Sequence, residues 1–245
     1  ITTLDRSSEN VVYFPYLLQR AVKRQSCMSN IYGDQHRDLQ QRFDTTQLAD
    51  RLEQMIIKSA LDERDRDFIT SRDMFFLSTI DHLGRPTVSY KGGDPGFIHI
   101  IDEQTIAFPS YDGNGMYLSM GNIQGSPNIG CLFIDLQHPN RLRLQGSATI
   151  DLQDPLRARY PEADLVVRVA IQQLWVNCPR YIHHYEKLEA SKFVPRANVE
   201  TPMAPWKRVD IVQDVLPAKD VGRAVEAGGL LTLAEYDRQI SKDDN

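Results

Sequence analysis

The 245-residue sequence has little cysteine, no long apolar run and no excess of basic residues. Its three cysteines, Cys27, Cys131 and Cys178, are odd in number and widely spaced, so we expect no disulfide framework and a cytoplasmic location. No stretch approaches the roughly 18 apolar residues that a membrane-spanning helix needs. The opening letters ITTLDRSSEN lack a basic region followed by an apolar one, so we expect no secretory signal.

The net charge of −5 argues against a protein that binds duplex nucleic acid. A metal site is not expected either, because Cys178, His183 and His184 fit no common zinc spacing. Apolar residues make up 41% of the chain, which is enough for the core of a globular protein. This composition is that of an ordinary soluble globular protein.

The first seventy residues have a helical pattern. Leu48, Leu52, Met55 and Ile56 recur at helical spacing, and the segment VVYFPYLLQRAVKRQ predicts a short helix from near Pro15. The intervening SCMSNIYGDQHRD is typical of a connection. The charged run LDERDRDF predicts a solvated helix face.

From Met74 onward the sequence is typical of short β-strands. Six segments are rich in aromatic and β-branched residues and are separated by turn sequences: MFFLSTID, TVSYKGG, FIHIIDE, TIAFPSY, NIGCLFIDL and RLRLQGSATI. This spacing predicts an antiparallel barrel or sandwich. Only the gap DGNGMYLSMGNIQGSP is long enough for a helix, which we expect to begin at Asn114 and Gly115 and to bury Tyr117, Met120 and Ile123.

The remainder of the chain predicts one more strand, VVRVAIQQLWVN, and short helices in DPLRARYPEADL, CPRYIHHYEKLEA and AEYDRQI. We therefore divide the chain into three parts. An N-terminal helical extension, residues 1–70, packs on a β domain, residues 71–185, and a C-terminal tail with short helices follows, residues 186–245.

The stretch YKGGDPGF raises two interpretations, a turn between strands or a place where the backbone approaches a ligand. Lys91 ends the second predicted strand beside these glycines. Arg141 and Arg143 lie two apart on another strand and so point to one face. A helix N-terminus at Asn114 and Gly115 suits an anion. Together these groups suit a phosphorylated, planar ligand, although each alone is more often a solvated surface feature.

The order of these segments resembles the pyridoxamine 5′-phosphate oxidase-like family of FMN-binding split barrels. The resemblance lies in FLSTIDHLGRPTVSYKGG, DPGFIHIIDEQTIAFPSYDGN, MGNIQGSPNIGCLFID and RLRLQGSATI, while NCPRYIHHY and the helical extension are similar to larger, non-vitamer members. It implies a mainly β protein with flanking helices, built on a six- to seven-stranded antiparallel split β-barrel. It further implies a homodimer that binds FMN at its interface.

The resemblance also implies which residues contact FMN: Thr87, Val88, Ser89, Tyr90, Lys91, Phe108, Pro109, Ser110, Asn114, Gly115, Met116 and Arg141. Tyr111, Arg180 and Tyr181 are candidates for contact with the substrate. No residue is identifiable as a catalytic acid or base, and His99, between isoleucines, is more typical of a structural histidine.

Two departures from the family pattern bear on the activity. The vitamer oxidase has an Arg-Lys pair that grips the FMN phosphate where this chain has Asn114 and Gly115. The oxidase also has an Arg-x-His element near its C-terminus, and EYDRQISKDDN has none. We therefore expect an FMN-dependent oxidoreductase acting on a small substrate other than pyridoxamine phosphate. The alternatives are a flavin-binding protein without turnover, such as a sensor or store, and a split barrel that binds haem or a deazaflavin.

Overall fold

The computed structural model describes residues 31–243, and the chain divides into two compact units with the boundary between Leu188 and Glu189. The helix expected near Pro15 lies outside the described residues. In the first unit, the described part opens with the helices α2 (Asp34–Arg42), α3 (Thr46–Ile56) and α4 (Glu63–Thr70). The predicted three-part division of the chain remains a prediction.

Two of these helices differ from the sequence-based expectation. Helix α2 lies in the segment predicted as a connection; it buries no residue, so its sequence has no apolar periodicity to reveal it. Helix α4 was predicted with a solvated face, yet Asp65 is fully buried. Its carboxylate pairs with the Lys58 ammonium group and bonds the backbone of the N-cap residue Asp62, which explains why it is retained inside.

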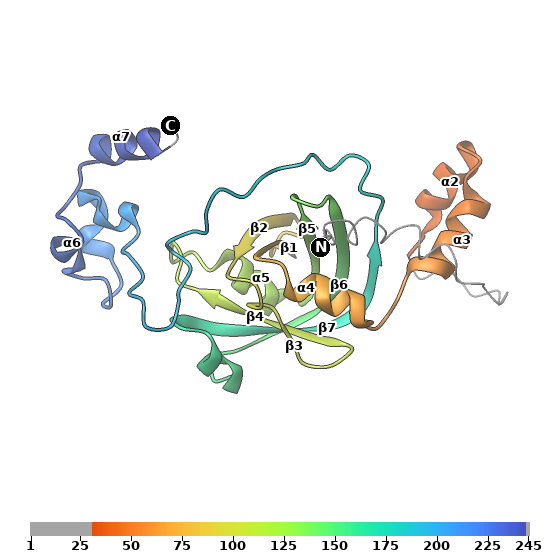
Figure 1. Cartoon of the computed structure of the whole chain (residues 1–245), viewed down its shortest axis with the longest axis horizontal. Helices are drawn as coiled ribbons and strands as arrows, with labels where there is room; N and C mark the ends of the chain where they lie inside the picture. The colour runs from red at the N-terminus through yellow and green to blue at the C-terminus, as the bar shows by residue number, and fades with distance from the viewer. Residues whose placement is uncertain (1–30, 244–245) are drawn as a thin grey trace, which may run out of the picture. The chain divides into compact units, whose positions relative to one another are not determined.

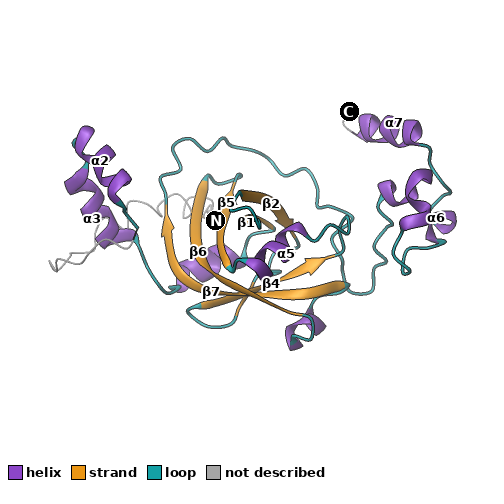
Figure 2. Cartoon of the chain, turned by 180° about the vertical axis from the view of Figure 1, so that it is seen from behind, coloured by secondary structure: helices purple, strands orange, loops and turns teal. Residues whose placement is uncertain are grey.

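The sheet of the first unit has seven strands, all paired antiparallel in the order β2-β1-β5-β6-β7-β4-β3 (Figure 1). This confirms the predicted mainly β architecture with six to seven strands. The strands are β1 (Met74–Ile80), β2 (Pro86–Gly92), β3 (His99–Ile100), β4 (Thr105–Tyr111), β5 (Asn128–Asp135), β6 (Asn140–Asp151) and β7 (Ala163–Val176). Helix α5 (Leu118–Gly125), labelled in Figure 2, precedes β5 in the chain. The short 3-10 helix η1 (Pro155–Arg159) precedes β7.

The core shows that the sheet curls into a barrel. Phe75 on β1 packs its ring 5.0 Å from the ring of Phe108 on β4 and 5.3 Å from that of Phe133 on β5. All three side chains are fully buried. Strands β1 and β4 are separated by three other strands in the sheet order, so they meet only because the sheet closes around this aromatic cluster.

The segment after β7 differs from its prediction. CPRYIHHYEKLEA was predicted to be helical, but residues 178–190 form no helix. Pro179 lacks a backbone donor, and the segment is tied to the barrel instead: the Tyr185 N–H donates to the Leu136 carbonyl at 2.8 Å, and Lys187 pairs with Asp73 at 2.5 Å. These tertiary contacts hold the chain extended.

The second unit contains the 3-10 helices η2 (Pro205–Arg208) and η3 (Asp210–Val215) and the helices α6 (Arg223–Glu226) and α7 (Leu233–Asp243). Helix α7 confirms the prediction from AEYDRQI. The interior of this unit holds an ion pair, with the ammonium of Lys207 2.7 Å from a carboxylate oxygen of Asp220 and both residues buried.

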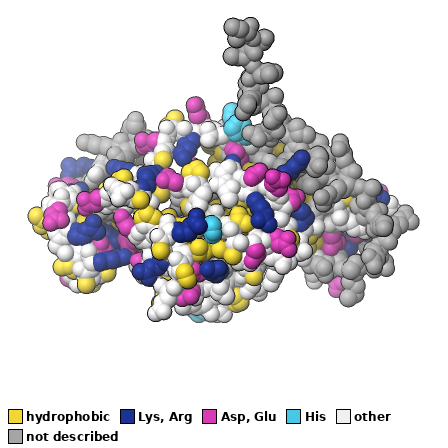
Figure 3. Space-filling view, turned by 60° about the horizontal axis from the view of Figure 1, so that its bottom comes forward, with side chains coloured by type: hydrophobic (Ala, Val, Ile, Leu, Met, Phe, Trp, Pro, Cys, Tyr) yellow, Lys and Arg dark blue, Asp and Glu magenta, His cyan; other side chains and the backbone are white. Residues whose placement is uncertain are grey.

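Two further findings concern residues 31–243. None of their helices has the length and apolar character to cross a membrane. No group of three or more His, Cys, Asp or Glu side chains there is placed to hold a metal ion. The face shown in Figure 3 carries acidic and basic side chains interspersed with apolar ones.

Candidate functional site

A cleft of about 380 Å³ opens between β2, the end of β4 and the start of α5. Its volume falls within the range of about 300–1,000 Å³ found for small-molecule sites. The cleft is lined by Ser89, Lys91, Ser110, Tyr111, Gly113, Asn114, Gly115, Tyr117, Leu118, Ser119 and Met120. Six of these are residues predicted as cofactor or substrate contacts: Ser89, Lys91, Ser110, Tyr111, Asn114 and Gly115.

Strand register determines why Ser89 and Lys91 line the cleft. Ser89 pairs with Leu77 and Lys91 pairs with Phe75 across the β1–β2 ladder. Directly paired residues share a face of the sheet. Because Leu77 and Phe75 belong to the barrel core, Ser89 and Lys91 also face inward.

A network of hydroxyl and amide groups fixes α5 against the sheet beside the cleft. The Ser89 and Ser119 hydroxyl oxygens are 3.0 Å apart. One turn further along α5, the Asn122 amide donates to the hydroxyl oxygens of Thr79 at 3.0 Å and Thr87 at 3.3 Å. These bonds set the position of the helix N-terminus relative to β2.

Two of the titratable side chains that line the cleft, Lys91 and Tyr111, have shifted pKa values. Burial lowers the pKa of the Lys91 ammonium, which forms no ion pair with any residue in the described part of the chain. Burial, together with the charge of Asp94, raises the pKa of the Tyr111 phenol to about 12. At neutral pH the Tyr111 phenol is therefore a neutral hydroxyl group, whereas burial disfavours the charged form of Lys91 unless an anion binds beside it.

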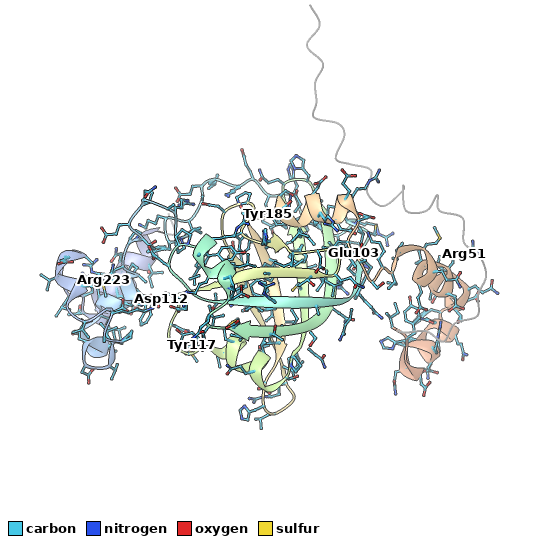
Figure 4. The ribbon with its side chains drawn as sticks, turned by 90° about the horizontal axis from the view of Figure 1, so that it is seen from below. Arg51, Glu103, Asp112, Tyr117, Tyr185 and Arg223 are labelled. Atoms are coloured by element: carbon cyan, nitrogen blue, oxygen red, sulfur yellow. The ribbon has the colours of Figure 1, made fainter. Side chains whose placement is uncertain are left out.

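The loop that closes the cleft begins after β4 and ends at Tyr117 (Figure 4). The Asn114 carboxamide oxygen accepts a hydrogen bond of 3.1 Å from the Met116 N–H, and Gly115 has a φ of +77°. The helix was predicted to open at these two residues, but it begins at Leu118. The reason is that Gly115 and Tyr117, with φ of +47°, both adopt left-handed conformations that interrupt a helix.

The start of α5 contributes polar backbone rather than polar side chains. Its N-cap residue, Tyr117, is half exposed and makes no capping bond, so the prediction that Tyr117 is buried was wrong. Met120 and Ile123 are buried, as predicted. Leu118 and Ser119 line the cleft, so the uncapped N–H groups of the first turn, which carry partial positive charge, lie beside it.

Several predicted cofactor contacts lie away from the cleft. Val88 and Tyr90 alternate with Ser89 and Lys91, so they point outward and are 69% and 61% exposed. Phe108 and Pro109 are buried in the sheet. Two others also lie outside the lining: Thr87, which bonds Asn122, and Met116, which is exposed.

Arg141 lies on the opposite face of the sheet from Lys91. Its neighbour on β6, Leu142, belongs to the barrel core, so alternation turns Arg141 outward. Its guanidinium donates through Nη2 to the Cys178 carbonyl at 3.2 Å, while its Nε is buried and has no hydrogen-bond partner among the described residues. One chain alone does not bring Arg141 to the cleft.

The remaining candidates are also outside the cleft. The Arg180 guanidinium lies 5.0 Å from the centre of the Tyr181 ring, and Tyr181 is 79% exposed. His99 lies on the short strand β3, and burial, with the charges of Arg159 and Arg168, lowers the pKa of its imidazole. This environment favours the neutral form of the imidazole.

The glycines of YKGGDPGF are explained by packing within this chain. A Cβ atom on Gly93 would lie 2.3 Å from the Phe97 ring, and one on Gly92 would lie 2.8 Å from the Tyr90 ring. The turn is closed by a hydrogen bond of 2.9 Å from the Phe97 N–H to the Asp94 carbonyl. The turn interpretation therefore accounts for Gly93, whereas a side chain at Gly92 would require only a shift of the exposed Tyr90 ring.

The family model described as pyridoxamine 5′-phosphate oxidase matches residues 61–177. This segment is a domain of that family. The match spans all seven strands and α5, and with them every residue that lines the cleft. The family and the split-barrel fold predicted from the sequence are thus confirmed.

Solved structures of family-like proteins are similar to this chain at low identity. A putative pyridoxamine 5′-phosphate oxidase from Lactobacillus delbrueckii is 18% identical, with a TM-score of 0.40 over 48% of this chain and 95% of that one. HutZ, the haem storage protein from Vibrio cholerae, is 18% identical, with a TM-score of 0.36 over 47% of this chain and 94% of that one. An FMN-binding protein from Syntrophomonas wolfei is 12% identical, with a TM-score of 0.35 over 47% and 89%. No curated protein sequence matches the chain.

Sequence reasoning missed part of the lining of the cleft. Ser119 and Leu118 were not among the predicted contacts, because the helix start was placed four residues too early in the chain. The signal that locates Ser119 is its spacing from Asn122, one turn away, which puts both polar side chains on the face toward β2.

Proposed function

We propose that this domain binds FMN in the cleft between β2, β4 and α5 and acts as an oxidoreductase on a small substrate. The observation that carries the proposal is the inverted polarity of β2. Its inward side chains are Thr87, Ser89 and Lys91, whereas Val88 and Tyr90 face outward. Polar groups inside a barrel are stabilised when they bind something there.

The residues of the cleft fit a phosphorylated ligand. The uncapped N-terminus of α5 offers backbone N–H groups, and Lys91 adds a full positive charge from the facing strand. Asn114 already bonds the Met116 N–H and occupies a position where the vitamer oxidase has a cation. The phosphate would therefore depend on α5 and Lys91.

The cleft also fits the polar edge of a planar ring. Hydroxyl groups of Ser89, Ser110 and Tyr111 line it and are able to donate and accept hydrogen bonds. FMN, when bound, supplies hydride transfer through its N5 atom. The protein's own residues orient the ring, hold positive charge near it and shape the space for the substrate.

A homodimer completes this proposal. Val88 and Tyr90 form an exposed apolar surface on the outer face of β2, next to the Phe76 ring of β1. A second copy would cover these side chains and would bring Arg141, Arg180 and Tyr181 to a shared interface. The scarcity of cysteine further supports a cytoplasmic location.

A second candidate is a flavin-binding protein without turnover. The titratable side chains among the described residues of the cleft are Lys91, Tyr111 and Tyr117, and the pKa of Tyr111 is about 12. The Tyr111 phenol is therefore not suited to release a proton at neutral pH, and the described lining contains no carboxylate or imidazole. Anaerobic addition of reduced nicotinamides distinguishes the two: bleaching of the flavin favours the oxidoreductase, and an unchanged spectrum with every donor favours the binding protein.

The first experiment is a visible absorption spectrum of the purified protein, with the released small molecule identified by mass. A flavin spectrum and the mass of FMN would support the proposal. A Soret band would replace it with a haem protein, and the mass of a deazaflavin would change the cofactor. A colourless protein that takes up none of the three would remove the cofactor and the oxidoreductase.

A further inference from the structure

Among the lysines whose side chains the structure describes, three are not exposed: Lys58, Lys91 and Lys207. Two of these three pair with buried carboxylates. The Lys58 ammonium pairs with Asp65, and the Lys207 ammonium lies 2.7 Å from a carboxylate oxygen of Asp220. Lys91 forms no ion pair with any described residue. Its amino group is therefore the exception, because an ammonium ion that leaves water without gaining a counter-ion is destabilised.

The side chain of Lys91 reaches the cleft from the inner face of β2. Its cross-strand partner Phe75 belongs to the aromatic core, so the stem of Lys91 leaves the sheet on the core side. The cleft of about 380 Å³ has room for a small molecule beside this side chain. Its described lining contains no carboxylate, imidazole or guanidinium group, so no charged partner there favours the protonated form of Lys91.

Hydroxyl groups surround the space that a ligand of Lys91 would occupy. Ser89 lies two residues before Lys91 on the same face of β2, and Ser110 and Tyr111 line the cleft from the end of β4. Each hydroxyl can donate a hydrogen bond to a carbonyl oxygen. A desolvated lysine that opens into a cleft is suited to form imines with carbonyl compounds, because its neutral amine is a nucleophile.

We propose that Lys91 binds small uncharged aldehydes covalently, as imines, when no anion occupies the cleft. The lone pair of the Lys91 nitrogen attacks the carbonyl carbon, and a carbon–nitrogen bond forms. The carbonyl oxygen takes up the two protons that the nitrogen gives up and leaves as water. The step needs no oxidant, reductant or metal, and hydrolysis reverses it.

The charge of the ligand decides which role Lys91 takes. An anion beside the amino group favours the ammonium form, which has no lone pair and does not attack a carbonyl group. An uncharged aldehyde leaves the amine neutral, and the neutral imine suits a partly buried position without a counter-ion. This assignment goes beyond the proposed function, in which the ammonium form of Lys91 holds the FMN phosphate. FMN and an aldehyde should therefore compete for the cleft.

The test is reductive trapping of the full-length protein, freed of bound small molecules, with benzaldehyde and sodium cyanoborohydride at pH 7. The reductant converts an imine into a stable benzylamine, and peptide mapping by mass spectrometry locates the benzyl group. Lys91 is expected to be labelled several-fold faster than the exposed Lys192. The anionic 4-carboxybenzaldehyde should show no such preference for Lys91. Labelling of Lys91 by benzaldehyde no faster than that of Lys192, or the same preference with both aldehydes, would overturn the proposal.

A counter-ion placed beside Lys91 tests the role of charge. Ser89→Asp puts a carboxylate on the same face of β2, two residues from Lys91, and should slow the labelling of Lys91 several-fold because it favours the ammonium form. Ser89→Asn has the same size without the charge and should slow it less. Val88→Asp adds the same charge on the outer face of β2 and should leave the labelling unchanged. Equal rates in Ser89→Asp and Ser89→Asn would refute the proposal.

FMN added to the same samples separates this proposal from the flavin hypothesis. FMN added before the aldehyde should protect Lys91 and leave the labelling of Lys192 unchanged. Preferential labelling of Lys91 in a protein that binds no FMN, as judged by quenching of flavin fluorescence, would keep the imine site and remove the flavin. Binding of FMN without preferential labelling of Lys91 in the FMN-free protein would keep the flavin and remove the imine site.

Discussion

Strands β1 and β2 are hydrogen-bonded neighbours, yet they distribute polarity in opposite ways. On β1, Phe75 and Leu77 face the interior and are fully buried. On β2, the residues paired with them are Lys91 and Ser89, while the apolar Val88 faces solvent. Burial of a charged group costs free energy, so the pattern of β2 is not one that stability alone would select.

This difference suggests that the two paired strands have different roles. The inward face of β1 contributes to the core, and the inward face of β2 contributes to the proposed ligand site. The depressed pKa of Lys91 is consistent with this, because burial penalises its charged form and no residue described here compensates it with an ion pair. Substitutions on the inner and outer faces of β1 and β2 should therefore have different effects.

The largest effect is expected from the core side of the ladder. Leu77→Ala should lower the free energy of unfolding by about 2–5 kcal/mol, because Leu77 is fully buried and its truncation leaves a cavity. Urea denaturation measures the loss. Ser78→Ala, at the next position on the outer face, should change it by less than about 0.5 kcal/mol. Similar losses in the two variants would contradict the assignment of the faces.

The outer face of β2 should govern assembly. Replacing both Val88 and Tyr90 with aspartate should weaken the proposed homodimer by roughly 2–4 kcal/mol, because charges would enter a proposed apolar contact that includes an aromatic residue. Light scattering coupled to size exclusion follows the dissociation. Leu83→Asp is the matched control, since Leu83 is equally exposed but lies in the turn between β1 and β2. A double variant that stays dimeric would place the interface elsewhere.

The inner face of β2 should govern the cofactor. Lys91→Met is expected to weaken FMN binding by about 1–3 kcal/mol, the range for a hydrogen bond to a charged group. Quenching of flavin fluorescence measures the affinity. Lys192→Met removes an equal charge from an exposed position in the second unit and should leave it unchanged. Unaltered affinity in Lys91→Met would remove Lys91 from the site.

Lys91→Met, which should weaken FMN binding, should increase the stability of the folded protein. The pKa of Lys91 is lower in the folded protein than its ordinary value of 10.5, so the unfolded chain binds more protons between those two values. Stability of the wild type therefore rises with pH through that interval. Lys91→Met should be the more stable protein at pH 7, and its advantage should shrink as the pH approaches 10.5. Thermal unfolding of both proteins across this pH range measures the difference in stability. A difference that stays constant up to pH 10.5 would contradict the prediction.

Much of the barrel was predictable because alternation and turn sequences are local signals. The β1, β2, β4, β5, β6 and β7 segments were all predicted within a few residues. The pattern failed for FIHIIDE, where only His99 and Ile100 pair as a strand. Phe97 and Ile98 are buried through tertiary contacts, and burial without pairing gives the same apolar letters.

The site was less predictable for a different reason. Sequence order placed Lys91, Ser110 and Tyr111 near a common ligand, and the structure brings them together in one cleft. The sequence could not show that Arg141 points to the other face of the sheet, because the direction of Arg141 depends on which of its neighbours on β6 fill the core. The predicted start of α5 was wrong because Tyr117 has a positive φ, and a tyrosine in the sequence gives no sign that its backbone is left-handed.

The smallest effect is expected at Ser89, which both lines the cleft and holds α5 in position. Its hydroxyl is 3.0 Å from that of Ser119, so Ser89→Ala removes one hydrogen bond that positions α5, worth about 0.5–1.5 kcal/mol of stability. Ser119→Ala should cost a similar amount, and the double variant should cost little more than either alone, because the second substitution removes a group that has already lost its partner. Urea denaturation of the three variants completes this cycle. Additive losses would mean that the two hydroxyls act separately, and the position of α5 would then depend on Asn122 and its two threonines.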